Sequence, residues 1–367
     1  MRKTVLGGIF IGIQLVTVIA VLVSIFASNK KNLVQCRAAM ILNGPVDDLS
    51  WGQSHYEGMK AACEKFGVTL QVRESVMGVD ECAWAIEDFI RRGCNIIVCD
   101  SIEFTDAVLE MAEKYPDCCF LHATGLEQGK NIVTYFGRIY QARYLSGIVA
   151  GLQTKSDTIG YVAAMKIPEV VRGINAFALG VHSVNPRARV KVVWTEDWVS
   201  DDAAESETEK LLRRFPSIDV LAIHTDSQRV LQIAEERGIW SIGYNIDNSA
   251  LYPRTFLTAP VWNWEGFYTE QIEAVVKNKF YGRHYWFDET KGIFELSPLT
   301  GNVRDVTIGV VESAKARIEG GLFDVFYGPI YDENGVKRVF EGENIPDSVL
   351  LNEFDWFVKG VEVYEGE

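Results

Sequence analysis

The sequence lacks the short motifs by which common catalytic sites are recognised. It contains no G-x-S-x-G, no G-x-x-x-x-G-K-[ST], no G-x-G-x-x-G and no H-E-x-x-H. Its five histidines are widely separated, and no further ligand or nucleophile stands at a recognisable spacing from them. His122 and His224 each end a predicted strand, where hydrogen bonding to a ligand is a better interpretation than a metal or acid–base pair. We therefore predict no enzyme activity, no metal and no cofactor.

The chain also lacks the basic charge of a nucleic-acid-binding protein. Its 36 lysines and arginines are outnumbered by 50 acidic residues, which leaves a net charge of −14. A protein that binds nucleic acid normally presents a basic face to the phosphates. The seven cysteines include no C-x-x-C pair, and their odd number leaves at least one outside any pairing within the chain. No disulfide pairing follows from the sequence.

Long apolar runs are absent except at the N-terminus. Arg2 and Lys3 precede an uncharged run from Val5 to Ala27. A positive start before an apolar segment is typical of an export signal, and 23 residues are also enough to cross a bilayer as a helix. Residues 1–28 are therefore predicted to be a signal peptide or a membrane anchor. We expect the protein outside the cytoplasm, in the periplasm or at the cell surface.

Cys36 raises a second possibility for attachment. It follows Leu33-Val34-Gln35, which resembles a lipoprotein box only loosely, because Gln35 is unsuitable there and charged lysines separate the box from the apolar run. We expect Cys36 to open the first strand, with lipidation as the alternative.

From Arg37 onward, short apolar runs alternate with amphipathic stretches, which predicts parallel strands connected by helices. The first unit has its predicted strands at Ala38–Leu42, Thr69–Arg73, Asn95–Cys99 and Cys119–His122. The same alternation of strands and helices begins again after Leu152, with predicted strands at Thr158–Ala163, Val190–Trp194, Val220–His224 and Trp240–Tyr244. A chain of 367 residues with two such units predicts two lobes. Three later helices, expected to cross between the lobes, are predicted near Glu265–Asn278, Val306–Glu319 and Pro346–Lys359.

Ligands of open α/β sheets bind beyond the carboxyl ends of the strands, so the residues that follow each strand are the candidates for a site. Five of the nine tryptophans fall in these positions: Trp51, Trp194, Trp198, Trp262 and Trp264. Such loops are usually polar and rich in glycine, and stacking on a flat ligand explains tryptophan there. The alternative is that each ring covers the core between a loop and a helix.

Eight ordered motifs carry a resemblance to a known family. They are Gly44–Gly58 (GPVDDLSWGQSHYEG), His122–Gly125, Tyr135–Gly147, Gly160–Gly180, Val193–Trp198, His224–Ser227, Gly243–Asp247 and Pro260–Trp264. The chain resembles the basic membrane protein family, the purine nucleoside receptor-like substrate-binding proteins, from about Arg37 to Lys359. The resemblance implies an α/β, type I periplasmic-binding-protein fold, with two Rossmann-like lobes, a ligand cleft and three crossovers. We place lobe 1 at residues 36–155 plus about 263–285, and lobe 2 at 156–262 plus about 286–367.

The resemblance also implies a ligand site. Nucleoside-binding members hold the base between two aromatic rings and the ribose by carboxylates, an asparagine and a lysine. Trp51 and Trp198 stand at the two ring positions, whereas Gly52 replaces the asparagine and Trp262 replaces the lysine. Two ribose contacts are therefore missing. In this respect the chain resembles the branch of the family associated with free purine bases such as adenine.

Two further positions bear on polar recognition. Asp247 keeps a family carboxylate, and Asn245 stands where an aspartate is common. The predicted ligand-binding residues are Trp51, Asp48, Ser101, His122, Thr124, Met165, Trp198, Asp226, Asn245, Asp247 and Trp262.

The predicted function is the receptor of an ABC importer, which captures a purine base between its lobes and presents it to a permease. The alternatives are a nucleoside or riboflavin in the same cleft, a membrane-anchored ligand-sensing receptor, and a nucleoside hydrolase, for which no catalytic group is found.

Overall fold

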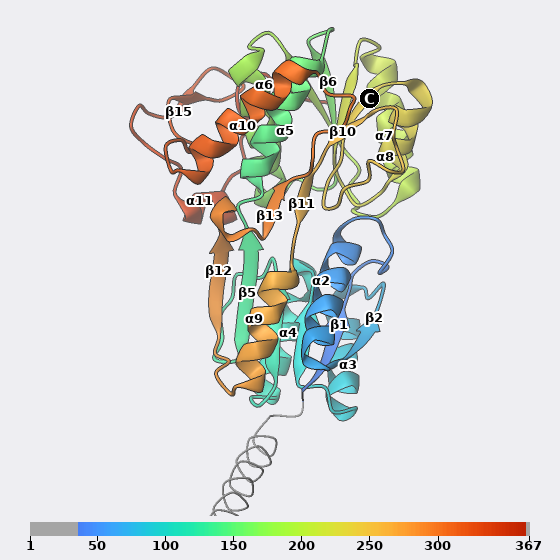
Figure 1. The fold of residues 1–367 in the computed structure, drawn as a ribbon, viewed down its shortest axis with the longest axis vertical. Helices are drawn as coiled ribbons and strands as arrows, with labels where there is room; N and C mark the ends of the chain where they lie inside the picture. Colours follow the sequence, from blue (N-terminus) through green and yellow to red (C-terminus); the bar gives the residue numbers. More distant parts are fainter. Residues whose placement is uncertain (1–35, 365–367) are drawn as a thin grey trace, which may run out of the picture.

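The computed structural model describes residues 36–364. The predicted signal peptide or anchor at residues 1–28 lies outside them. Within the described part of the chain, no helix combines the length and the apolar character needed to span a membrane. The described residues form two α/β lobes, one above the other in Figure 1. The fold is the predicted type I periplasmic-binding-protein fold.

The first lobe is built on a parallel sheet with the strand order β12-β5-β4-β3-β1-β2. Its strands are β1 (Arg37–Ile41), β2 (Thr69–Arg73), β3 (Ile96–Cys99), β4 (Cys119–Ala123), β5 (Ile132–Gly137) and β12 (Arg283–Phe287). Its helices are α2 (Trp51–Phe66), α3 (Gly78–Arg91), η1 (Ile102–Phe104), α4 (Thr105–Lys114) and α9 (Glu265–Val276). Alternate residues of β1 face opposite layers: Ala38 and Met40 pack with α2 and α9, and Ala39 and Ile41 pack with α3 and α4. Burial on both faces explains the continuous apolar run of the central strands β1 and β3, whereas the edge strands β2 and β12 are only partly buried and carry polar residues.

The second lobe repeats this arrangement with the strand order β10-β9-β8-β6-β7-β16. Its strands are β6 (Thr158–Ala163), β7 (Arg189–Trp194), β8 (Val220–His224), β9 (Trp240–Ile242), β10 (Phe256–Thr258) and β16 (Val361–Val363). Its helices are α5 (Tyr140–Gln153), α6 (Pro168–Val184), α7 (Asp201–Arg214), α8 (Arg229–Arg237) and α10 (Asp305–Glu319). Helices α5 and α6 approach closely because Gly147 has no side chain at their contact. A Cβ added at Gly147 would lie 2.1 Å from the carbonyl oxygen of Phe177.

Within residues 36–364 the chain crosses between the lobes three times. It passes from β5 to α5, from β11 (Pro260–Trp262) to α9, and from β12 through η2 (Glu289–Lys291) to β13 (Phe294–Leu296). Strands β11 and β13 pair antiparallel and form a ribbon between the two lobes (Figure 1).

Two expectations about these crossings need correction. Helix α5 packs along α6 in the second lobe, so the first crossing lies near residue 138 and not at residue 155. The predicted crossing helices do not cross, because α9 packs on α2 in the first lobe and α10 packs on α5 in the second. Strands and short loops make the crossings instead.

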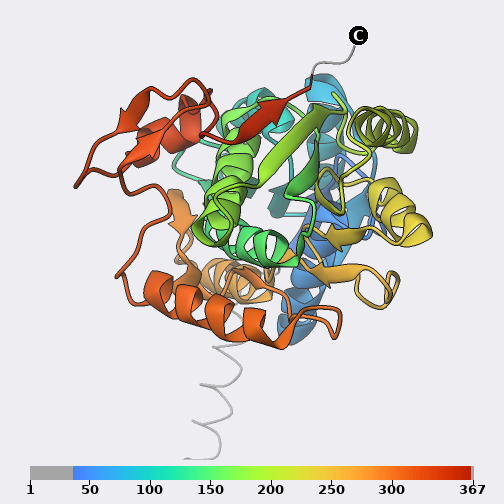
Figure 2. The same cartoon turned by 90° about the horizontal axis from the view of Figure 1, so that it is seen from above.

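The C-terminal segment also differs from its prediction. After α10 it forms a hairpin of β14 (Ile330–Tyr331) and β15 (Lys337–Val339), the short helix α11 (Asp347–Asn352) and β16, which pairs with β7 at the edge of the second sheet (Figure 2). The helix predicted to reach Lys359 thus ends at Asn352. The side chain of Asn175 on α6 explains the difference: it donates to the carbonyl of Trp356 and accepts from the N–H of Val358, which satisfies an extended backbone.

Candidate functional site

A cavity of about 370 Å³ lies between the lobes, at the carboxyl ends of both sheets. The first lobe contributes Asn43, Trp51, Asp100, Ser101, Thr124, Phe136 and His284. The second lobe contributes Met165, Glu169, Arg172, Trp198, Asp226, Tyr244 and Asn245, and the C-terminal segment adds Leu351. Its volume is near the lower end of the roughly 300–1,000 Å³ that is typical of small-molecule sites.

Seven of the eleven predicted residues line this cavity: Trp51, Ser101, Thr124, Met165, Trp198, Asp226 and Asn245. Asp48, His122, Asp247 and Trp262 do not. Of the five tryptophans at strand ends, Trp51 and Trp198 line it, whereas Trp264 is buried against His55 and Trp194 packs near Phe357. Covering the core is therefore the role of the tryptophans at positions 194 and 264.

The two tryptophans of the cavity come from opposite lobes and are held by their surroundings. Trp51 begins α2, and its indole N–H donates to the carbonyl of Asp100 at 3.0 Å. Trp198 follows β7, and its carbonyl accepts from the Thr225 hydroxyl at 2.6 Å and from the Asp226 N–H at 2.7 Å. Each lobe therefore presents one indole to the cavity; the Trp51 ring is fixed by its own hydrogen bond, and Trp198 is held through its backbone.

Asp226 reaches across the interface between the lobes. Its Oδ1 accepts from the hydroxyl of Ser50, the N-cap of α2, at 2.7 Å, and from the amide of Asn245 at 2.9 Å. Burial raises the pKa of Asp226 to about 8, and the charge of Asp48 adds to this, although the donors around Asp226 favour its charged form. This carboxyl therefore belongs both to the cavity wall and to the contact between the lobes.

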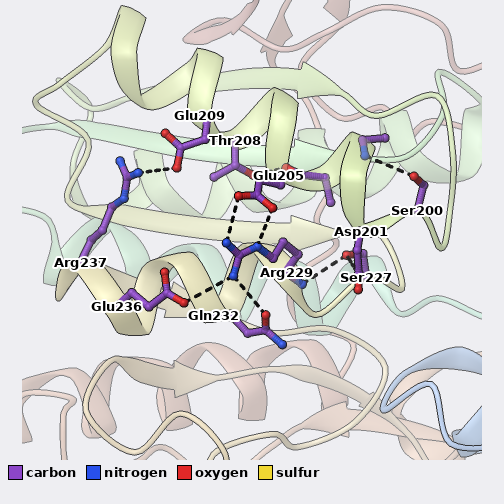
Figure 3. A network of polar contacts seen from close by, with 12 residues as sticks. Ser200, Asp201, Glu205, Thr208, Glu209, Ser227, Arg229, Gln232, Glu236 and Arg237 are labelled. Carbon is purple, nitrogen blue, oxygen red and sulfur yellow. Dashed lines mark hydrogen bonds and ion pairs between the residues drawn. The ribbon is translucent and has the colours of Figure 1, made fainter.

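A polar network on the second lobe fixes the loop that carries Asp226 (Figure 3). The next residue, Ser227, donates to Asp201 at the start of α7, at 2.6 Å. Arg229 then binds both oxygens of Glu205 on α7, each at 3.0 Å, and also contacts Glu236. Partly exposed ion pairs contribute little stability singly, but this set joins α7 to α8 beside the loop.

Asp100 is a wall residue that sequence reasoning missed, although it directly follows β3. It is fully buried, and its Oδ1 accepts from the N–H of Asn43 at 3.0 Å. Its Oδ2 has no hydrogen-bond partner among residues 36–364. Burial raises the pKa of Asp100 well above its ordinary value, and the charges of Asp48 and Asp226 act in the same direction. A neutral carboxyl can both donate and accept a hydrogen bond.

A buried polar group on α6 was also missed. Glu169 and Arg172 stand three residues apart, on one face of the helix, and both line the cavity. Glu169 accepts from the Tyr244 hydroxyl at 3.3 Å and contacts His224 Nε2 at 3.2 Å. The local signals were Pro168, which marks the start of this helix at the carboxyl end of β6, and the family motif Gly160–Gly180, which contains both Glu169 and Arg172.

The charges of this group follow from its burial. Burial alone would raise the pKa of Glu169, but the hydrogen bond with His224 and the nearby Arg172 lower it overall. Burial lowers the pKa of His224 to about 4, so its ring is neutral near pH 7. Burial also lowers the pKa of Arg172. The wall therefore presents a carboxylate beside a guanidinium.

The four predicted residues outside the cavity have other partners. Asp48 accepts from the backbone N–H groups of Ser50, Gly52 and Gln53 at 2.7–3.0 Å, and so caps α2. Asp247 is exposed and accepts from the N–H of Ser249. His122 is buried; burial lowers its pKa to about 4, and its Nε2 contacts the carbonyl of Ser101 at 2.8 Å.

Trp262 lies behind the cavity wall. Its indole N–H donates to Oδ1 of Asn245 at 3.0 Å, and its ring stacks on Trp264 with centroids 4.6 Å apart. Trp262 therefore positions the Asn245 side chain from behind, and Asn245 itself has a positive φ of 68°, which asparagine tolerates better than most residues.

The described residues show neither a metal site nor a disulfide. No group of three or more histidine, cysteine or acidic side chains within residues 36–364 is placed to hold a metal ion. No disulfide joins the seven cysteines, all of which lie in this range.

The chain is similar to proteins of one family. The profile of the family described as "ABC transporter substrate-binding protein PnrA-like" matches residues 35–318. The chain is 33% identical over 328 residues to a purine-binding protein of Brucella abortus (strain 2308), which covers 89% of this chain and 93% of the relative.

Two further likenesses bear on ligand and fold. The chain is 32% identical over 326 residues to a putative ABC transporter glucose-binding protein of Haloferax volcanii, with 89% of this chain and 80% of the relative covered. Its fold matches a solute-binding protein of an ABC transporter system from Aeropyrum pernix K1 with a TM-score of 0.69 and 17% identity, over 79% of this chain and 92% of the other.

Proposed function

The chain belongs to the family of PnrA-like substrate-binding proteins of ABC transporters, and from that premise we propose that it captures a free purine base, similar to adenine, between its lobes. Proteins of this family bind substrates for transport and are not enzymes. The observation that carries the proposal is the pair of indoles, Trp51 and Trp198, which line one small cavity from opposite lobes. Flat aromatic ligands gain dispersion and burial from such rings.

The positions expected to contact a ribose favour a base without a sugar. A Cβ added at Gly52 would lie 2.5 Å from the carbonyl oxygen of Pro45, so this helix start has no room for an asparagine. Trp262 is directed to Asn245 and offers no cation to the cavity. Sugar hydroxyls buried without partners would cost roughly 1–3 kcal/mol each.

The polar wall supplies groups suited to the edge of a purine. Oδ2 of Asp100 has no partner within the described chain, and Asp226, Glu169 and Arg172 also line the cavity. A purine edge alternates hydrogen-bond donors with acceptors, and a neutral carboxyl matches both kinds. We propose that Asp100 takes the recognition role expected of Asp247, which is exposed outside the cavity.

The test begins with the ligand that the protein carries. We expect mass spectrometry of the compound released from the denatured, purified protein to find a purine base. Calorimetric titration should then show that adenine binds at least tenfold more tightly than adenosine, because the ribose hydroxyls of adenosine would be buried without hydrogen-bond partners.

The titration panel also includes inosine, riboflavin and glucose, the last because of the name of the Haloferax relative. Tighter adenosine binding would show that other residues hold a ribose. Binding of riboflavin or glucose alone would replace the purine proposal.

We also propose that the protein works outside the cytoplasm and delivers its ligand to an ABC permease, attached to the membrane through its N-terminal residues. Fractionation of cells that produce the full chain tests the location. Recovery of the protein only from the cytosol would contradict it.

A further inference from the structure

We infer that the C-terminal segment, residues 319–364, forms one wall of the ligand cavity, and that Leu351 on this wall determines which ligand sizes are accepted. The family profile matches residues 35–318 and does not include this segment, whereas the alignments with the two relatives above cover 89% of the chain and extend past residue 318. The inference rests on the proposed function for the identity of the ligand, but not for the position of the wall.

The geometry places one apolar side chain of the segment at the cavity. Leu351 lies on α11 and lines the cavity together with Phe136 of β5 and His284 of β12. The preceding residue, Leu350, is buried in the core of the second lobe. The helix is thus held by Leu350, while the half-buried Leu351 faces the ligand space.

Arg172 ties this helix to the polar wall. Its guanidinium donates to the carbonyl of Leu350 at 2.9 Å, and Arg172 itself lines the cavity. A buried guanidinium has few rotamers available while it binds a backbone carbonyl and lies near the ring of Trp286, 5.0 Å from its centroid. The position of Leu351 is therefore coupled to a side chain that forms part of the site.

A second attachment joins α11 to the first crossing between the lobes. Asp347 receives two hydrogen bonds from Arg138, at 2.7 and 2.6 Å, in the paired geometry of a carboxylate with a guanidinium. The N–H of Arg138 donates to the carbonyl of Phe287 at 2.7 Å, where the third crossing begins. The wall is thus anchored to the second lobe and also to the strands that connect the lobes.

A wall held at several points cannot retreat easily from a larger ligand. In a cavity of about 370 Å³, the isobutyl group of Leu351 then limits the substituents that fit on one side of the ligand. A difference of one methylene in an apolar pocket commonly changes affinity by roughly 10–200-fold. The segment thus sets an upper size for the ligand.

The test uses two substitutions of opposite effect in the full-length protein. Leu351→Ala should raise the affinity for at least one of N6-methyladenine, 6-benzylaminopurine and adenosine, relative to adenine, by about tenfold or more. Leu351→Trp should weaken adenine binding by about tenfold or more. Val349→Ala and Val349→Trp are the controls, because Val349 is half-buried on the same helix but does not line the cavity. Folded Leu351 variants with affinities and ratios within about twofold of the wild type would overturn the inference.

A separate readout distinguishes failure of the wall from failure of the proposed function. A wild-type protein that binds none of these purines contradicts the proposed function. The wall is then judged from a crystal structure of the Leu351→Trp variant. An indole inside the cavity supports the inference, and an indole turned to solvent overturns it.

Discussion

At the scale of single residues, the two indoles of the cavity should account for much of the binding energy. Stacking on an aromatic ring is worth about 0.5–1.5 kcal/mol beyond the burial of its area. We expect Trp51→Ala and Trp198→Ala each to weaken adenine binding by about tenfold or more in calorimetric titrations, because both burial and stacking are lost.

Two controls accompany these variants. Trp84 is 51% exposed on α3, and Asp247 is exposed outside the cavity, so Trp84→Ala and Asp247→Ala should leave the affinity unchanged. Unchanged affinity in both cavity variants would contradict the assigned ligand position. A large loss in Asp247→Ala would restore the role that the family pattern implied for this carboxylate.

Asp226 should make the stability of the protein depend on pH. Its pKa is about 8 in the folded protein and about 3.9 in an unfolded chain, so the folded state retains a proton that the unfolded state releases. The stability contributed by this proton is present at low pH and is lost as the pH rises from about 4 to about 8. We expect the melting temperature of the wild type to fall relative to that of Asp226→Asn between pH 5 and pH 8.

The comparison with Asp226→Asn removes the effect of groups that do not interact with Asp226; the difference between the two proteins includes Asp100, whose pKa the charge of Asp226 raises. His122 and His224, whose pKa values are lowered to about 4, favour the folded state as the pH rises, but they are present in both proteins. Parallel melting curves for the two proteins across this range would show that Asp226 is ionised in the folded state as it is in the unfolded chain, and that its pKa is not raised.

At the scale of elements, the contact between α5 and α6 depends on two glycines. A Cβ at Gly147 would lie 2.1 Å from the Phe177 carbonyl oxygen, and one at Gly180 would lie 2.0 Å from the Tyr144 carbonyl oxygen. Because backbone atoms cannot move aside as a side chain can, Gly147→Ala and Gly180→Ala should each lower the free energy of unfolding by about 1–3 kcal/mol or more in urea titrations.

Gly309 provides a matched control within α10. No atom lies within 4 Å of a Cβ added there, so Gly309→Ala should raise the free energy of unfolding by about 0.5–1 kcal/mol through helix propensity. If the three alanine variants changed the free energy of unfolding equally, the close contact between α5 and α6 would not require glycine at positions 147 and 180.

At the scale of the whole molecule, direct hydrogen bonds hold the lobes together. The carbonyl of Leu49 in the first lobe accepts from the side-chain amides of Gln228 and Asn248 in the second, each at 3.1 Å. Ser50 and Asp226 add the contact described above. These bonds form beside the cavity, so they favour the arrangement in which a ligand would be enclosed.

Removal of these bonds should therefore open the unliganded protein. We expect the double variant Gln228→Ala, Asn248→Ala to show a larger radius of gyration in X-ray scattering and weaker ligand binding, since each bond contributes about 0.5–1.5 kcal/mol. Gln232→Ala is the control, because Gln232 lies on α8, which Gln228 precedes as N-cap, and belongs to the surface network of Figure 3. A variant as compact as the wild type would show that other contacts maintain the closed arrangement.

The sequence by itself determined the repeated α/β order, the two lobes, the family and the two indoles of the cavity. These features depend on local periodicity and on residues directly after strands, such as Trp51 and Trp198, and both can be read along the chain. The strand-end rule also selected Trp194 and Trp264, because it locates the end of a strand but not the direction of each side chain; Asp247 was selected by the family pattern, which does not record that direction either.

Only the tertiary structure decided which polar groups meet at the cavity. Asp100 and Asp247 both follow strands, yet the loop around Asp247 turns its carboxylate outward, whereas Asp100 is buried among the strand ends. Leu351 reaches the site from a short helix, held by Arg172 and Arg138, that lies far along the chain from the other wall residues. Such contacts depend on how distant segments pack, and no local pattern in the sequence records that packing.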